Sequence, residues 1–212
     1  MDAIGDWFKE AVNTGSPRLE SQNADPARVP PHQIVTDKLP VMTYGSMTPN
    51  VSTSQWALRL FGLVGEEVVL DWDRLMGLEQ VDETNDFHCV TQWSRLDARW
   101  GGVRASDVLA LCRPAAEATH VMLHCYDGYT TNVGLDVLHG TDVLFVHMLF
   151  GEPLPREHGG PVRLVIPSRY GWKSAKWVSA VEFMPQDSPG FWEQRGYHMR
   201  GEYWAEERFG QP

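Results

Sequence analysis

The stretch Asp86-Phe87-His88-Cys89-Val90-Thr91-Gln92-Trp93-Ser94-Arg95 decides how the rest of the chain is interpreted. In it, an apolar, strand-like segment ends in polar, aromatic and cationic residues around a single thiol. A lone cysteine is more often a small buried hydrophobe than a functional site, so this stretch by itself leaves both interpretations open. Cys89 is therefore a candidate whose role depends on the other motifs of the chain.

The composition restricts the class of protein. The chain has 212 residues, 42% of them hydrophobic, which is enough for one sizeable core and favours one domain. A net charge of -10 without a Lys/Arg-rich run argues against nucleic acid and anionic membranes as partners. The apolar stretches are too short to cross a bilayer, so we expect no membrane span.

The cysteines and the N-terminus indicate the compartment. Three cysteines at positions 89, 112 and 125 are an odd number at irregular spacing and form no C-x-x-C pair. They fit free thiols better than a disulfide framework. Residues 1–10 lack a basic export signal. We therefore expect a cytoplasmic protein.

Short apolar segments between glycine- and proline-bearing turns predict a strand-rich chain. The expected strands cover residues 56–63, 68–70, 120–125, 143–149, 162–166 and 177–184. Asp71 is the expected N-cap of a helical turn over 72–76, and Ser106 with Asp107 is expected to open a second helix that ends before Pro114.

The order of these segments predicts the fold class. Residues 13–40 are rich in proline, serine and charge and are expected to be extended, and residues 1–12 are a candidate amphipathic helix. Regular strand-helix alternation and phosphate-loop motifs are both missing from the sequence. We predict a mixed-sheet α+β fold, with an extended N-terminal lead-in over 1–38 and one domain over 39–212.

A second group of residues gathers positive charge. Glu157-His158-Gly159-Gly160-Pro161-Val162-Arg163 is followed, over 167–177, by Pro-Ser-Arg-Tyr-Gly-Trp-Lys-Ser-Ala-Lys-Trp. Four cations, glycines and hydroxyl groups crowd this region of an acidic protein, as the binding of an anionic phosphate requires. A solvated charged loop is the alternative.

Together these segments resemble the molybdopterin-binding domain shared by sulfite oxidases and the bacterial protein-methionine-sulfoxide reductase catalytic subunit. The resemblance covers residues 39 to 209. It includes Leu-Pro-Val-Met-Thr-Tyr-Gly (39–45), His-Cys-Val-Thr-x-Trp-Ser-Arg-Leu-Asp (88–97), Asp-Gly-Tyr-Thr-Thr-Asn (127–132), His-Gly-Gly-Pro-Val-Arg-Leu (158–164), Trp-Lys-Ser-Ala-Lys-Trp (172–177) and Gly-Phe-Trp-Glu-Gln-Arg-Gly-Tyr-His (190–198).

The resemblance implies a molybdenum-molybdopterin cofactor in which Cys89 ligates the metal. A soft thiolate suits a metal that is already bound by sulfur. The cofactor-binding residues that the resemblance implies are Thr43, Tyr44, Cys125, His158, Arg163, Lys173, Ser174, Ala175 and Lys176. Cys125 stands where the reductase has threonine, and His158 where it has asparagine. His139 aligns near a histidine that faces the pterin, although a gap intervenes.

The implied reaction is the transfer of an oxygen atom to or from a small S- or N-oxo compound. Arg95 and Arg99, close to Cys89 in the sequence, are candidates for holding an anionic substrate. The sequence has no haem-ligand or flavin motif, so we expect a separate electron-transfer partner. The dimerisation domain of full sulfite oxidases has no counterpart after the cofactor domain, and we therefore expect a monomer.

Three other interpretations compete with a molybdopterin oxidoreductase: a zinc site, a non-catalytic binding domain and a serine hydrolase. His120, His124 and Cys125 could form a zinc site, but on a strand the two histidines lie roughly 13 Å apart and the cysteine points to the other face. A non-catalytic domain that binds molybdopterin or a partner protein is the main alternative. A serine hydrolase lacks its G-x-S-x-G motif.

Overall fold

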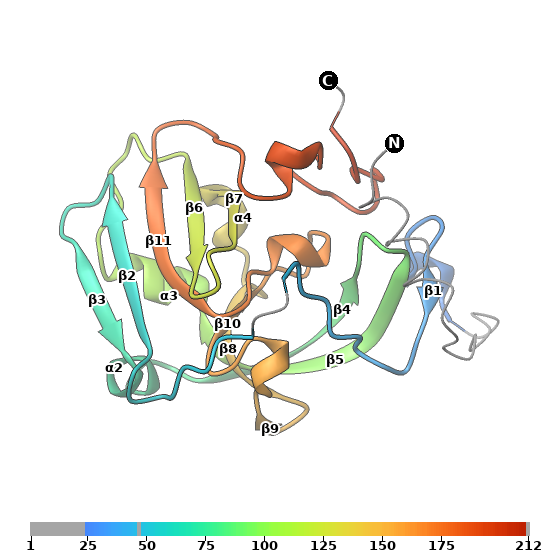
Figure 1. Ribbon diagram of the computed structural model, residues 1–212, viewed down its shortest axis with the longest axis horizontal. Coiled ribbons are helices and arrows are strands. Elements are labelled where there is room, and N and C mark those ends of the chain that lie inside the picture. Colours follow the sequence, from blue (N-terminus) through green and yellow to red (C-terminus); the bar gives the residue numbers. More distant parts are fainter. Residues whose placement is uncertain (1–23, 46–47, 211–212) are drawn as a thin grey trace.

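The computed structural model describes residues 24–45 and 48–210. The chain forms two sheets that pack on one another (Figure 1). The expected helix over 1–12 lies outside the described residues. Among the described residues, no helix is long and apolar enough to cross a membrane.

One sheet has five strands in the order β3-β2-β11-β6-β7. Its strands are β2 (Ala57–Gly62), β3 (Val68–Asp71), β6 (His120–Cys125), β7 (Thr130–Gly134) and β11 (Val178–Met184). β11 runs parallel to β2 and antiparallel to β6, so the sheet is mixed. The predictions for β2, β3, β6 and β11 are confirmed to within one residue at each end. β7 was not predicted.

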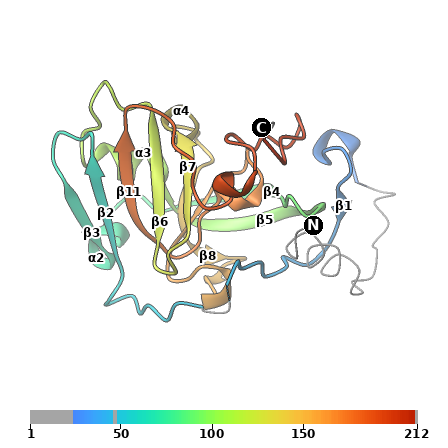
Figure 2. The same ribbon diagram turned by 45° about the horizontal axis from the view of Figure 1, so that its top comes forward.

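The second sheet follows the order β1-β5-β8-β10, with β4 paired to β5 and β9 paired to β8. Its strands are β1 (Ile34–Val35), β4 (Val81–His88), β5 (Trp93–Arg104), β8 (Leu144–Leu149), β9 (Glu152–Pro153) and β10 (Arg163–Val165). The ribbon of β4 and β5 reaches away from the five-stranded sheet toward β1 (Figure 2). Because β1 pairs with β5, the expected lead-in joins the sheet.

Short helices connect the strands: α2 (Trp72–Met76), α3 (Ala105–Ala110), α4 (Leu135–Leu138) and the 3-10 turns η2 (Pro26–Arg28), η3 (Arg156–His158), η4 (Gly171–Lys173) and η5 (Glu193–Arg195). Asp71 caps α2 as predicted, because its carboxylate accepts a hydrogen bond from the Arg74 N–H at 2.9 Å. The cap predicted for α3 is wrong: Arg104 is the N-cap and makes no side-chain cap bond, so Ser106 lies inside the helix.

The main core lies between the two sheets. Leu58 and Leu60 alternate with exposed neighbours along β2 and are fully buried, which is the period of a half-buried strand. They belong to one apolar cluster with Val103 of β5 and Phe145 of β8, so both sheets share this core. The mixed-sheet α+β prediction is confirmed, with strands predominating and the helices short.

Candidate cofactor site

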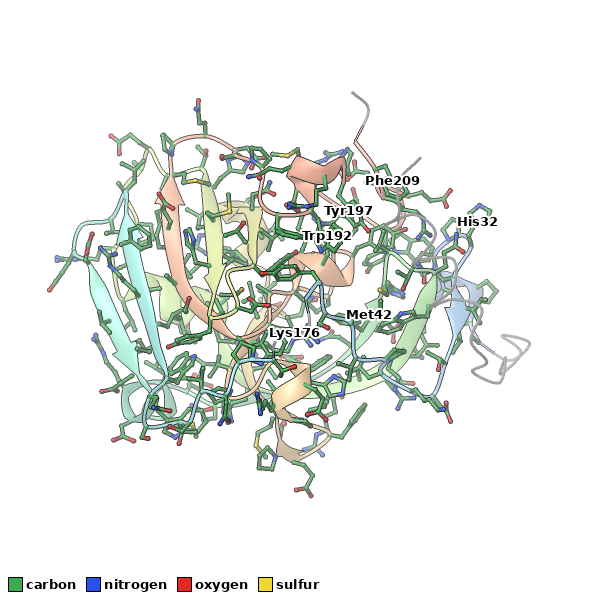
Figure 3. All side chains as sticks on the ribbon, in the orientation of Figure 1. His32, Met42, Lys176, Trp192, Tyr197 and Phe209 are labelled. Atoms are coloured by element: carbon green, nitrogen blue, oxygen red, sulfur yellow. The ribbon has the colours of Figure 1, made fainter. Side chains whose placement is uncertain are left out.

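A cavity of about 120 Å³ opens where several loops meet in the middle of the molecule. Most of its wall is apolar and aromatic. Figure 3 shows Met42, Lys176, Trp192 and Tyr197, four of the lining residues, grouped around this central region. The wall also includes Leu39, Thr43, Tyr44, Phe87, Cys89, Thr91, Trp93, Asp127, Tyr129, His158, Arg163, Trp172, Ser174 and Trp177.

The turn between β4 and β5 places Cys89 in the cavity wall. The Cys89 N–H donates to the Trp93 carbonyl at 2.9 Å, and the Gln92 N–H donates to the Cys89 carbonyl at 3.1 Å. Gln92 has a φ of 69°, the left-handed conformation that closes such a turn. Cys89 is 7% exposed and lines the same cavity as Arg163 and Lys176.

Burial raises the pKa of the Cys89 thiol, because a thiolate is poorly solvated there. A hydrogen bond from Thr91 Oγ1 to Sγ, 3.1 Å long, acts in the opposite direction. The thiol is therefore positioned and partly supported as an anion, and a positively charged metal would stabilise the thiolate further.

Arg163, on β10, is a buried cation at the base of the cavity. Its Nη1 donates to the His158 carbonyl at 3.0 Å and its Nη2 to the Ser174 carbonyl at 2.9 Å. Its Nε is also buried and has no hydrogen-bond partner among the described residues. Burial lowers the pKa of Arg163 to about 10. A buried guanidinium that contacts carbonyl groups and no carboxylate in the described chain is suited to an added anion.

Lys176 adds a second cation to the same wall. Its Nζ donates to the Glu157 carbonyl at 2.8 Å. Burial, and then repulsion from Arg163, lower the pKa of Lys176 to about 7. Burial, Arg163 and Lys176 likewise lower the pKa of His158. Arg163 and the protonated form of Lys176 create a positive potential that a phosphate would relieve.

Gly159 allows the chain to pass close to both cations. Its φ is 110°, and a Cβ placed on it would lie 3.0 Å from the Cβ atoms of Arg163 and Lys176. A side chain at this position would fill the space between η3 and the cationic wall. The glycine therefore brings backbone polar groups near the Arg163 guanidinium.

The structure brings together seven of the predicted site residues in the cavity wall: Thr43, Tyr44, Cys89, His158, Arg163, Ser174 and Lys176. Tyr44 is held by a hydrogen bond from its hydroxyl to the Asp127 carbonyl at 2.7 Å. Cys125 and Ala175 do not line the cavity; both are buried in the main core. His139 is exposed at the end of α4 and lies outside the cavity wall.

Lys173 and Arg95 also lie elsewhere. The Lys173 Nζ is 2.6 Å from Oε1 of Glu193, and both side chains are buried. The prediction that Lys173 contacts a phosphate is therefore not supported, because its charge is already paired. The guanidinium of Arg95 lies over the Phe150 ring, 5.2 Å from its centroid, rather than in the cavity. Arg99 pairs with Asp82 at 3.1 Å.

Strand β6 carries His120 and His124, the two histidines of the alternative zinc site. His120 and His124 are oriented toward different carboxylates, with Nε2 of His124 at 3.0 Å from Glu182 and Nε2 of His120 at 3.8 Å from Asp187. Each histidine thus has its own neighbour on the surface of the five-stranded sheet.

The sequence analysis missed several residues of the cavity wall. They are mostly aromatic or apolar: Leu39, Met42, Trp93, Asp127, Tyr129, Trp172, Trp192 and Tyr197. All of them fall within motifs that carried the family resemblance. The available signal was therefore the density of aromatic residues in those motifs.

The chain is similar to known proteins over most of its length. The profile of the family described as "Oxidoreductase molybdopterin binding domain" matches residues 45–192. "Uncharacterized oxidoreductase YuiH" of Bacillus subtilis (strain 168) is 42% identical over 188 residues, 89% of this chain and 95% of that protein. "Sulfite oxidase, mitochondrial" of Homo sapiens is 34% identical over 116 residues, 47% of this chain but 20% of that protein.

Among solved structures, the sulfane dehydrogenase SoxCD from Paracoccus pantotrophus has a similar fold. The match has a TM-score of 0.63 at 20% sequence identity and covers 71% of this chain and 43% of that one. The family profile covers more than half of the chain, and the relative from Bacillus subtilis is similar over nearly its whole length. The chain therefore belongs to the oxidoreductase molybdopterin-binding domain family and is a molybdopterin oxidoreductase of the sulfite oxidase type.

Proposed function

We propose that this protein transfers an oxygen atom to or from a small S- or N-oxo compound, using a molybdenum-molybdopterin cofactor in the central cavity with Cys89 as the protein ligand to the metal. One observation carries the proposal. The Cys89 thiol shares a single cavity with Arg163 and Lys176, so a soft metal ligand and an anion-binding pair face the same space.

The residues of the cavity fit such a cofactor. Nε of Arg163 and Nε1 of Trp93 are buried donors without a partner among the described residues, and buried donors are normally satisfied. A polar pterin edge or a phosphate offers the acceptors that they lack. The space next to Gly159, between Arg163 and Lys176, gives a phosphate access to both cations.

Each residue has a definite task in this proposal. Arg163, Lys176 and the Ser174 region hold the phosphate, and Thr43 and Tyr44 cover the pterin. Cys89 is kept deprotonated by ligation despite its burial. When bound, the cofactor supplies the two-electron redox chemistry and the oxygen transfer. The aromatic walls limit the access of water to the reacting centre.

The proposal leaves Arg95 and Arg99 out of substrate binding, since neither lines the cavity. In this proposal electrons are exchanged with a separate protein or small carrier, as expected from a sequence that has no haem-ligand or flavin motif. The free thiols at 89, 112 and 125 support a reducing, cytoplasmic compartment for the same protein, which we expect to act as a monomer.

Metal analysis of the full chain, purified from a host that makes molybdopterin, tests the proposal. The expected result is stoichiometric molybdenum, a Mo(V) electron paramagnetic resonance signal, and reduction or oxidation of S- or N-oxo compounds. Cys89→Ser should change the signal and abolish turnover. Cys112→Ser is the matched control, because Cys112 is a buried thiol in the main core. Wild-type protein without molybdenum, or a Cys89→Ser signal identical to that of wild type, would overturn the proposal.

A further inference from the structure

The turn that carries Cys89 is held from outside by a residue of the N-terminal segment. Nε2 of Gln33 donates a hydrogen bond to the Cys89 carbonyl at 3.1 Å, and Gln33 is buried. The next residue, Ile34, donates its N–H to the Gln92 carbonyl at 2.9 Å. Gln33 and the first residue of β1 therefore contact both ends of the turn.

A residue of the C-terminal segment contacts the same turn. Nη1 of Arg208 donates to the Val90 carbonyl at 2.6 Å, and its Nη2 donates to the Pro31 carbonyl at 3.4 Å. The guanidinium also lies over the Tyr170 ring, 5.0 Å from its centroid. Figure 3 shows His32 and Phe209, the sequence neighbours of Gln33 and Arg208, on the same side of the molecule. One arginine thus joins the turn to the N-terminal segment.

A buried relay fixes the orientation of the Gln33 amide. Oγ of Ser94 donates to Oε1 of Gln33 at 3.3 Å, which leaves the amide nitrogen directed at Cys89. Nδ1 of His88 lies 2.8 Å from the same Ser94 hydroxyl. Ser94 and His88 are both buried, so water does not compete for these bonds.

The contacts from Gln33 and Arg208 add to the backbone hydrogen bonds inside the turn, which join Cys89 to Trp93 and to Gln92. Gln92 holds a left-handed φ of 69°, a conformation that costs energy for a residue other than glycine. A turn of this kind persists when the surrounding structure over-determines it. Gln33 and Arg208 both lie outside residues 45–192, the part matched by the family profile.

We propose that Gln33 and Arg208 are positioning residues that clamp the Cys89 turn, so that the cofactor site of this protein is completed by its two terminal segments. The inference rests on the proposed function in one respect, the role of Cys89 as metal ligand. The hydrogen bonds of the clamp join protein atoms only, so the clamp can be tested without the cofactor.

The test uses the full chain produced in a host that makes no molybdopterin. Alkylation of Cys89 by N-ethylmaleimide, followed peptide by peptide with mass spectrometry, reports how often the turn opens. Gln33→Met keeps the shape and removes the hydrogen bonds, and the expected rise in rate is about fivefold, the effect of one buried bond. Arg208→Met should raise the rate about tenfold, and Arg208→Lys less.

Two variants serve as matched controls. His32→Asn changes an exposed side chain next to Gln33 and keeps a residue that accepts the φ of 61° found there. Arg200→Gln changes an arginine of the C-terminal segment whose partner is Glu207 and not the turn. Both should alkylate at the wild-type rate. Circular dichroism confirms that each protein compared is folded, and Gln33→Met alone decides the matter if Arg208→Met does not fold.

A second readout uses the loaded enzyme. Moving the sulfur of Cys89 changes its orbital overlap with the metal, so the g-values of the Mo(V) signal should shift in Gln33→Met and Arg208→Met and stay unchanged in the controls. Wild-type alkylation rates in folded clamp variants would overturn the clamp. Wild-type protein that binds no molybdenum, with fast alkylation in the clamp variants, would overturn the proposed function and leave the clamp standing.

Discussion

Thr91 Oγ1 lies 3.1 Å from the Sγ of Cys89 and donates a hydrogen bond to it from two residues further along the same turn. This bond favours the thiolate over the thiol, and burial favours the thiol. Thr91→Val keeps the shape of the side chain and removes the donor. We expect the pKa of Cys89 in the cofactor-free protein to rise further, because the thiolate loses this hydrogen bond.

The pH dependence of Cys89 alkylation in the cofactor-free chain measures this pKa. Thr36→Val, which changes a threonine of the lead-in that contacts Lys38 and not Cys89, is the control. A pH profile that is the same in Thr91→Val and wild type would mean that the hydroxyl does not support the thiolate.

The buried pair Lys173–Glu193 is expected to stabilise the C-terminal segment against the five-stranded sheet. Oε1 of Glu193 also accepts hydrogen bonds from Trp172 Nε1 at 2.9 Å and Thr131 Oγ1 at 3.1 Å. Glu193→Gln leaves the Lys173 charge buried without a partner anion. The free energy of unfolding should fall by roughly 3–5 kcal/mol, as measured by urea denaturation.

The double variant Lys173→Met/Glu193→Gln is the control for this pair. It removes both charges and keeps an oxygen that can accept from Trp172 and Thr131. It should be more stable than Glu193→Gln alone. If the losses from the two single changes simply add in the double variant, Lys173 and Glu193 are not coupled, and the assignment of Lys173 to the structure instead of the cavity would be wrong.

The cation Lys176 should make the stability of the cofactor-free protein depend on pH. Burial lowers its pKa from 10.5 to about 7, so the unfolded chain binds more protons than the folded chain between these values. The free energy of unfolding must then rise with pH across this window. Folding removes a proton from the amine, and this costs less as the pH approaches 10.5. Lys176→Met should flatten the rise.

Thermal unfolding at several pH values between 6 and 10.5 measures the effect of Lys176, with the exposed Lys38→Met as control. Added pyrophosphate should stabilise the wild-type protein more than Lys176→Met below pH 7, where the amine carries its charge. Equal stabilisation of both proteins would show that this lysine does not bind the anion.

Gly102 has no room for a side chain, because the backbone of β8 lies directly against it. A Cβ at this position would lie 2.1 Å from the Phe145 carbonyl oxygen and 2.8 Å from the Cα of Val146, both backbone atoms of β8. Gly102→Ala should therefore cost about 3 kcal/mol of unfolding free energy. Gly77→Ala, with no atom closer than 3.5 Å and a φ of -79°, should be neutral or slightly stabilising. Denaturation curves of the two variants that coincide would contradict this account.

Two of the strands that the sequence failed to predict, β4 and β5, have a polar or interrupted apolar pattern. β4 reads Val-Asp-Glu-Thr-Asn-Asp-Phe-His, and its first six residues are exposed or half-buried. It lies at the edge of its sheet, so polar residues occupy the positions where a buried strand shows alternating apolar ones. β5 carries four charged residues and the Gly101–Gly102 pair, and these interrupt its apolar pattern although much of the strand is buried.

The sequence by itself determined the fold class, the motif around Cys89 and the cationic region that holds Arg163 and Lys176, because these depend on local pattern and on residue type. Only the tertiary structure separated Lys173 from Lys176, three residues apart. One meets Glu193, twenty residues later in the chain, and the other lines the cavity. It also brought Gln33 and Arg208 to the Cys89 turn. Such choices depend on partners distant in the chain, and no local pattern of residues records which distant partner a side chain will meet.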